Sequence, residues 1–172
     1  KMKTFKGRVV VPGTVASAEA LVTKQGFNTL ASFQKSLQFG DKTAKCGDQN
    51  NADLYEKPMF NTALCLPQTI GSTTGGMVLY CAAAMGRTPS CLLFSKPIDS
   101  LAAAGAILAD VWTDKPMPTI DNLGEEFLEA LLTRYKDDDM VGFCWDSGHE
   151  MCYNRSEDLL AKYGNKLLVT HI

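Results

Sequence analysis

The chain has 172 residues, 45% of them hydrophobic, so it can bury the core of one domain, or of one domain with an appendage. Its 17 basic and 19 acidic residues give a net charge of −2, which excludes the clustered positive surface that nucleic acids and anionic membranes attract. The sequence contains no recognisable signal peptide and no apolar stretch of spanning length, so we expect a cytoplasmic protein that binds neither nucleic acid nor a membrane.

Two strands are predicted near the N-terminus. Residues 5–11 are rich in valine and end at Pro12-Gly13, a turn signal, and residues 15–22 alternate in character. We expect these two strands to pair with each other. Residues 24–58 are polar and irregular, with only 30–37 indicating regular structure, and a long irregular segment inside a compact domain is often functional.

From residue 60 onward the pattern changes to alternating buried strands and helices, which is typical of α/β proteins. Between the first strand and the first helix lies a glycine-rich turn. The predicted strands cover residues 62–66, 90–94 and 118–120, and the predicted helices cover residues 74–85 and 100–109.

Helical spacing predicts which faces of these two helices pack against the sheet. The first helix carries Met77, Cys81 and Ala84 on one face. The second carries Leu101, Ala104 and Leu108 on one face, and its small residues Ala102, Ala103 and Gly105 permit close approach of a neighbour.

The last part of the chain predicts four further elements. A helix over residues 125–135 begins with two acidic side chains, which suit a helix N-terminus. After the charged segment 136–139 we expect a strand at 140–145, a helix at 156–163 and a strand at 166–170.

The six cysteines are widely separated and form no Cys-x-x-Cys pair. This pattern predicts free, buried thiols in a reducing compartment rather than a disulfide framework or a paired metal site. The residues are Cys46, Cys65, Cys81, Cys91, Cys144 and Cys152.

The turn at residues 71–76 consists of six small residues between a buried strand and a helix. Its amides fall at a helix N-terminus, where free donors and the helix dipole favour a carboxylate or phosphate. No lysine follows the turn, so it is not a nucleotide-binding P-loop. The alternative is an ordinary helix cap provided by Ser72 or Thr73.

Histidine is scarce, since only His149 and His171 occur. Chemistry in the first 148 residues must therefore use hydroxyl, carboxylate, amine or thiol groups, which excludes a Ser-His-Asp triad there. Ser72 becomes the candidate reactive group, activated by helix-terminus amides and a partner subunit. From the residues alone, a role of Ser72 as a cap has equal weight.

The first 130 residues resemble the small subunit, or swivel domain, of the aconitase X family. The resemblance implies a swivelling β/β/α domain over residues 1–130 that docks on a larger catalytic subunit. It is carried by Lys6–Val10 with Pro12-Gly13, by Ala18–Val22, by Leu64–Pro67 with Gly71–Gly75, by Ser95–Asp99, by Ala104–Ile107 and by Pro118–Asp121.

The resemblance also implies a function and a site. Such complexes dehydrate a hydroxy acid, with phosphomevalonate and cis-3-hydroxyproline among the known substrates. Ser72 would take up the proton, while Gly71, Thr73 and Thr74 would contact a small carboxylate or phosphate substrate. The family's iron or iron–sulfur centre is held mainly by the large partner, so this chain would bind no cofactor alone. The family often has arginine where this chain has Ile70.

The tail, residues 131–172, resembles part of a xylose-isomerase-like TIM barrel. The resemblance implies that Asp146 and His171 bind a divalent metal and that His149 contacts substrate. The barrel's two glutamate ligands and most of its strands are absent, so we expect a C-terminal β-α-β extension without a complete metal site. The join near residues 130–133 is open to three explanations: a natural fusion, a chimera or an assembly error.

Three functions therefore remain open at this point. The first is a dehydratase subunit that is inactive without its large partner. The second is a non-catalytic or chimeric module in which the glycine-rich turn is merely a cap. The third is the remnant of a divalent-metal sugar isomerase or epimerase.

Overall fold

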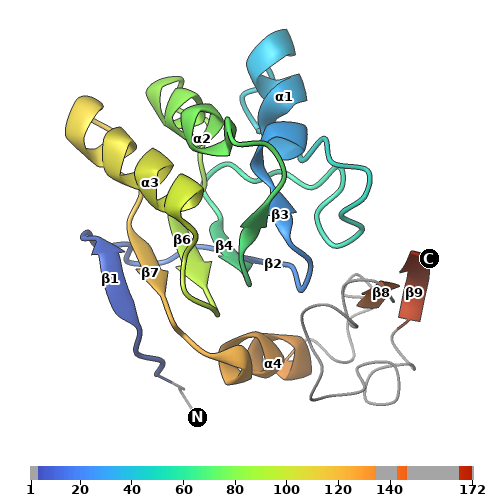
Figure 1. Ribbon diagram of the computed structural model, residues 1–172. Coiled ribbons are helices and arrows are strands. Elements are labelled where there is room, and N and C mark those ends of the chain that lie inside the picture. Colours follow the sequence, from blue (N-terminus) through green and yellow to red (C-terminus); the bar gives the residue numbers. More distant parts are fainter. Residues whose placement is uncertain (1–3, 135–142, 147–166, 172) are drawn as a thin grey trace. The chain divides into compact units, whose positions relative to one another are not determined.

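The computed structural model describes residues 4–134, 143–146 and 167–171. The chain divides into two compact units, Lys1–Leu131 and Leu132–Ile172. The first unit has a mixed α/β architecture (Figure 1). Among the described residues, every helix is too short or too polar to cross a lipid bilayer.

A five-stranded sheet forms the centre of the first unit. The middle strands are continuous apolar runs buried on both faces, as parallel strands usually are. β2, β4, β6 and β7 run parallel, whereas β1 at the edge is antiparallel to β7. The spatial order is β1 (Arg8–Val11), β7 (Thr119–Asp121), β6 (Cys91–Phe94), β4 (Ala63–Leu66) and β2 (Ala20–Val22).

The expected pairing of the first two strands is wrong, because β1 and β2 lie at opposite edges of the sheet. A long-range ion pair explains where β1 goes. Arg8 Nε donates to Asp121 Oδ1 at 3.0 Å, and the Ile98 amide donates to Asp121 Oδ2 at 2.8 Å. The hydrogen bond from Arg8 holds the pKa of the Asp121 carboxyl below its ordinary value.

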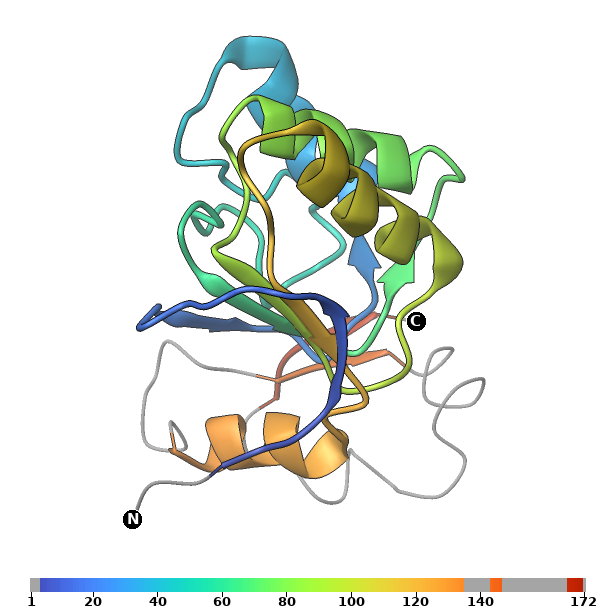
Figure 2. The same cartoon turned by 90° about the vertical axis from the view of Figure 1, so that its left-hand side faces the viewer.

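Helices cover both faces of this sheet (Figures 1 and 2). On one face lie α1 (Thr29–Phe39), α2 (Gly75–Ala84) and α3 (Ser100–Trp112), and on the other lies α4 (Glu125–Arg134). Successive side chains of a strand point to opposite faces of the sheet, so the strands contribute to two hydrophobic cores, one on each face. Leu64 packs toward the first three helices, whereas Cys65 packs against Phe127 of α4.

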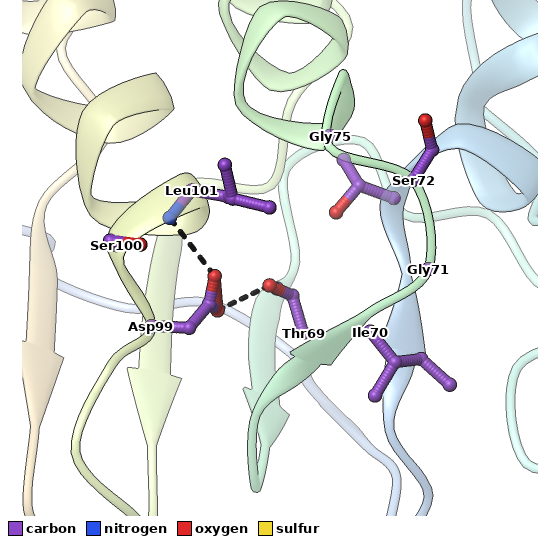
Figure 3. A pocket seen from close by; sticks show the side chains of 9 residues that line it. Thr69, Ile70, Gly71, Ser72, Gly75, Asp99, Ser100 and Leu101 are labelled. Atoms are coloured by element: carbon purple, nitrogen blue, oxygen red, sulfur yellow. Dashed lines mark hydrogen bonds between the residues drawn. The ribbon is translucent and has the colours of Figure 1, made fainter.

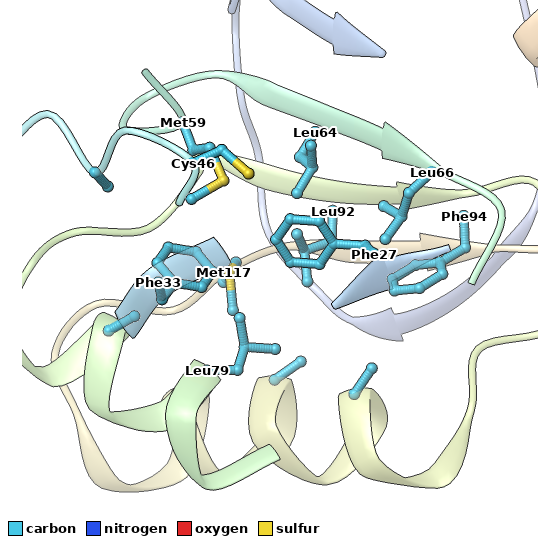
Figure 4. Packing of buried hydrophobic residues seen from close by; sticks show 14 of the residues in the cluster. Phe27, Phe33, Cys46, Met59, Leu64, Leu66, Leu79, Leu92, Phe94 and Met117 are labelled. Atoms are coloured by element: carbon cyan, nitrogen blue, oxygen red, sulfur yellow. The ribbon is translucent and has the colours of Figure 1, made fainter. Parts of the chain in front are cut away.

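The larger core is built of aliphatic, sulfur-containing and aromatic side chains (Figure 4). Phe27 and Phe33 meet edge to face, with ring centroids 6.0 Å apart. The other large side chains of this core are Leu54, Met59, Leu64, Leu66, Leu79, Leu92, Phe94 and Met117.

The segment after α1 contributes to this core. Ala44, Cys46, Leu54 and Met59 are fully buried, so the polar composition of the segment conceals four inward-facing side chains. Asp53 fixes the segment to the end of β2, because it accepts hydrogen bonds from the Thr23 hydroxyl and the Lys24 amide, each 3.0 Å long. Burial raises the pKa of the Asp53 carboxyl.

The predicted inner faces of α2 and α3 are wrong. Met77, Ala84, Leu101 and Ala104 are exposed, and Cys81 and Leu108 are half-buried. The physical reason is that the two helices meet at Gly76 and Gly105, and this contact sets which faces turn inward. The buried residues are Gly75, Gly76, Leu79, Ala82 and Ala83 on α2, and Ala102, Gly105, Ala106 and Ala109 on α3.

Two glycines bring the backbones of α2 and α3 into direct contact. A Cβ atom on Gly76 would lie 2.5 Å from the Leu101 carbonyl oxygen, and one on Gly105 would lie 2.6 Å from the Gly76 carbonyl oxygen. The prediction that small residues of the second helix permit close approach is therefore confirmed for Gly105.

Two short strands were not expected. β3 (Phe27–Asn28) and β5 (Thr69–Ile70) form a separate parallel pair, and each leads into a helix or a turn. β5 therefore separates the buried strand β4 from the glycine-rich turn.

The second unit contains a parallel pair of strands, β8 (Phe143–Asp146) and β9 (Leu167–His171). These correspond to the predicted strands at 140–145 and 166–170. The predicted helix at 156–163 and the charged segment at 136–139 lie outside the described residues.

Candidate functional site

A cleft of about 190 Å³ lies where three helices begin (Figure 3). Thr29, Gly75 and Ser100 are the first residues of α1, α2 and α3, and all three line it. The positive ends of three helix dipoles therefore meet at one place. The complete lining is Thr29, Thr69, Ile70, Gly71, Ser72, Gly75, Asp99, Ser100 and Leu101.

The three helix starts differ in how their amides are satisfied. Asn28 caps α1 by accepting from the Ala31 amide at 3.1 Å. Asp99 caps α3 by accepting from the Leu101 amide at 3.1 Å and the Ala102 amide at 3.0 Å. Thr74 at the start of α2 makes no side-chain cap hydrogen bond. The start of α2 is thus the one best suited to accept an anion from outside.

The glycine-rich turn has the geometry that its sequence requires. Gly71 adopts φ +98°, and a Cβ atom there would lie 2.8 Å from the Asn28 side chain, so both the backbone and the space demand glycine. Gly75 is less restricted, since a Cβ atom would meet only Thr29 atoms at 3.7 Å. Gly71 therefore keeps the turn close to the start of α1.

Ser72 is exposed at the rim of the cleft. Its hydroxyl lies 2.8 Å from the Thr74 hydroxyl and accepts from the Thr74 amide at 3.2 Å, ahead of the helix. This is a local turn contact of the kind serine often makes. The side chain points away from Thr69 and Asp99 in Figure 3. Ser72 is accessible, but none of the cleft's other lining residues holds its hydroxyl.

Two polar residues that line the cleft, Thr69 and Asp99, were given no role from the sequence. The Thr69 hydroxyl donates to Asp99 Oδ2, and Asp99 is the one charged residue among the nine that line the cleft. The signal was present, because an aspartate directly before a predicted helix is a typical N-cap. That position would have placed Asp99 at the same edge of the sheet as the turn.

The other site residues predicted from the sequence do not line this cleft. Thr73 and Thr74 are exposed next to the cleft without lining it. In the second unit, strand register sets Asp146 opposite His171, at the ends of two parallel strands. His149 lies outside the described residues.

The described residues do not fit an iron or iron–sulfur centre. Among them, no three His, Cys, Asp or Glu side chains lie close enough to share a metal ion. Cys46, Cys65 and Cys91 are buried free thiols and Cys81 is a half-buried one. Burial raises the pKa of the Cys65 thiol to about 12, which opposes the thiolate form that metals bind.

Comparisons with known proteins agree with this architecture. Residues 4–140 match the family model described as the aconitase X swivel domain. Among solved structures, the crystal structure of Thermococcus kodakaraensis aconitase X in its holo-form has the same fold, with a TM-score of 0.56 and 22% identity over 69% of this chain and 79% of that chain. No curated protein matches the chain.

A second solved structure is similar. It is the solution NMR structure of a UPF0107 protein, with a TM-score of 0.56 and 26% identity over 73% of this chain and 83% of that chain. The family match ends at residue 140, so the likeness of the tail to a TIM barrel stays a prediction.

Proposed function

Because the chain belongs to the aconitase X swivel-domain family, we propose that it is the small subunit of a hydro-lyase that dehydrates a hydroxy acid together with a larger catalytic subunit. The observation that carries this proposal is the uncapped start of α2, which lies in a cleft beside the exposed Ser72.

The substrate class follows from the cleft. The start of α2 has no side-chain cap hydrogen bond from Thr74, and the dipole of this helix favours a carboxylate or phosphate there. Gly71 and Gly75 let such a group approach the backbone. A volume of about 190 Å³ is below the roughly 300–1,000 Å³ of a complete small-molecule site. The cleft therefore suits the anionic end of a substrate, and a partner completes the site.

Ser72 is the proposed proton acceptor. In the dehydration, its hydroxyl oxygen, as the alkoxide, takes a proton from the carbon next to the carboxylate. The Ser72 hydroxyl then returns this proton to the hydroxyl group on the neighbouring carbon, which leaves as water. The carbon–carbon double bond forms and the Ser72 alkoxide is regenerated. The dipole of α2 stabilises the negative charge on the Ser72 oxygen, because the residue precedes the helix by three positions.

The family's iron or iron–sulfur centre is assigned to the large subunit. The described residues of this chain do not fit it, so no step here depends on it. The chain alone is expected to bind no cofactor and to show no turnover.

The test is reconstitution with the large aconitase X subunit. Formation of the double bond is followed with a phosphorylated hydroxy acid and with a hydroxyproline as substrates. Ser72→Ala should lower kcat at least about 100-fold without reducing assembly. Ser17→Ala, the same change at another exposed serine, is the matched control and should leave kcat unchanged.

Two results would contradict this function. Full activity of the Ser72→Ala complex would remove the role of Ser72. No chemical-shift change at residues 71–76 on titration with inorganic phosphate would favour a non-catalytic module, in which the turn only begins a helix.

A second proposal concerns the tail, and the register of β8 and β9 favours it. Asp146 and His171 are direct neighbours across the two parallel strands, which is where a carboxylate and an imidazole can share a divalent metal. Two ligands are fewer than a tight site needs. Calorimetry with manganese or cobalt tests the idea, and binding that is unaffected by Asp146→Asn or His171→Gln would refute it.

A further inference from the structure

The outward faces of α2 and α3 are apolar. We call this surface the outer apolar face. Met77, Val111 and Trp112 are 66%, 65% and 66% exposed, and the rings of Tyr80 and Trp112 meet edge to face with centroids 6.0 Å apart. The two helices lie side by side (Figure 1). Its members are Met77 and Tyr80 on α2 and Leu101, Leu108, Val111 and Trp112 on α3.

This exposure is unusual for helices of such composition. Asp110 is the one charged residue in α2 and α3 together. A helix that is apolar all round is normally covered on all sides. Here the inner faces are made of glycine, alanine and one leucine, so the bulkier apolar side chains lie on the side away from the core.

The size of the face indicates what can cover it. Two adjacent helices of this length present a surface of roughly 20 Å by 20 Å, or about 400 Å². A stable interface buries about 800 Å² on each partner, and a pair bound through this face alone would bury about 800 Å² in total, the size of a crystal contact. A second copy held by this face alone is therefore too small an interface. A partner that extends past the face is required.

The cleft lies next to one end of the face, because Leu101 belongs to both. An anionic substrate needs positive charge, yet the only charged residue that lines the cleft is Asp99. Basic side chains of a partner that reaches the rim of the cleft would add to the positive ends of the three helix dipoles there. Such a partner would cover the outer apolar face by the same approach.

We propose that the outer apolar face docks the large catalytic subunit, which presents an apolar patch beside basic side chains that complete the cleft. This inference rests on the proposed function and adds to it the surface through which the two subunits assemble. It also explains why the bulky apolar residues of α2 and α3 point outward.

The test compares two valine-to-lysine changes of nearly equal exposure. Val111 lies on the outer apolar face and Val9, which is 60% exposed, lies on β1. A lysine in the last turn of α3 suits the helix dipole, so Val111→Lys should fold normally by circular dichroism. We expect Val111→Lys to weaken binding to the large subunit at least tenfold in a surface-binding assay, and Val9→Lys to change it less than twofold.

The outcomes separate this inference from the proposed function. If the unaltered complex binds and turns over but Val111→Lys binds as tightly, only the docking face is refuted. If the unaltered chain does not bind the large subunit, both proposals are refuted. Sedimentation of the chain alone should show a monomer, and a dimer that Val111→Lys dissociates would assign the face to a second copy and overturn the inference.

Discussion

Substituting Gly76 by alanine should destabilise the first unit, whereas the same change at Gly75 should not. A Cβ atom on Gly76 would lie 2.5 Å from the Leu101 carbonyl oxygen, and ordinary contact begins near 3.4 Å, so α2 and α3 would have to separate by up to about 0.9 Å. The obstructing atom is backbone and cannot rotate aside. Overpacking then costs about 3 kcal/mol, the upper part of the usual range.

The gain in helix propensity offsets about 1 kcal/mol of this cost, which leaves a net loss of about 2 kcal/mol. For a chain of this size, that loss lowers the melting temperature by about 4–8 °C. Gly75→Ala meets only Thr29 atoms at 3.7 Å and should keep or slightly raise the melting temperature. Thermal unfolding by circular dichroism measures both. Equal melting temperatures for the two variants would refute the direct backbone contact of α2 and α3.

Three further predictions follow from other parts of the chain. The hydrogen bond from Arg8 lowers the pKa of Asp121 below its ordinary value of 3.8. The ionised Asp121 carboxyl therefore stabilises the folded chain above that pH, and this stabilisation is lost as the pH falls further. The free energy of unfolding in urea should therefore fall more steeply between about pH 5 and pH 2 for the unaltered chain than for Asp121→Asn; parallel slopes would contradict this. Iodoacetamide should label the half-buried Cys81 before the buried Cys65, as read by peptide mass spectrometry, and the reverse order would exclude the described burial. Ile70→Arg should tighten phosphate binding several-fold in an NMR titration, because it adds a guanidinium to a cleft without basic lining residues. Ile70→Gln is the uncharged control. Equal phosphate affinities of the two variants would mean that the anion binds elsewhere.

The alternation of buried strands and helices was predictable because the signals are local. Ala63–Leu66 and Cys91–Phe94 are short apolar runs followed by turn residues and helix formers, so each element follows from its own sequence. The partner of β1 was not predictable in this way. Strands that are adjacent in sequence usually pair, yet the ion pair of Arg8 and Asp121 joins residues 113 positions apart.

The prediction of which faces of α2 and α3 are buried failed for a different physical reason. Periodicity identifies an apolar face only when the opposite face is polar, and α2 and α3 are apolar on all sides. The size of the side chains then decides which face of each helix is buried. Gly76 and Gly105 form the close contact between the two helices, so Met77 lies on the exposed side.

The candidate site was predicted in part. The turn that carries Gly71 and Ser72 was found because consecutive small residues before a helix are a strong local signal. Thr69 and Asp99 come from segments 30 residues apart, and their hydrogen bond depends on the parallel order of the elements that carry them. A single sequence does not reveal that order.

The position of β1 also constrains how the chain can be made. During synthesis, Arg8 emerges long before Asp121, and the sheet cannot gain this edge until β7 has been released. Non-local pairing of this kind slows folding and leaves strand edges open in the meantime. A nascent chain that stops before residue 119 would have β6 as an open edge and β1 without its place, so truncated products of this protein should be captured by chaperones or aggregate.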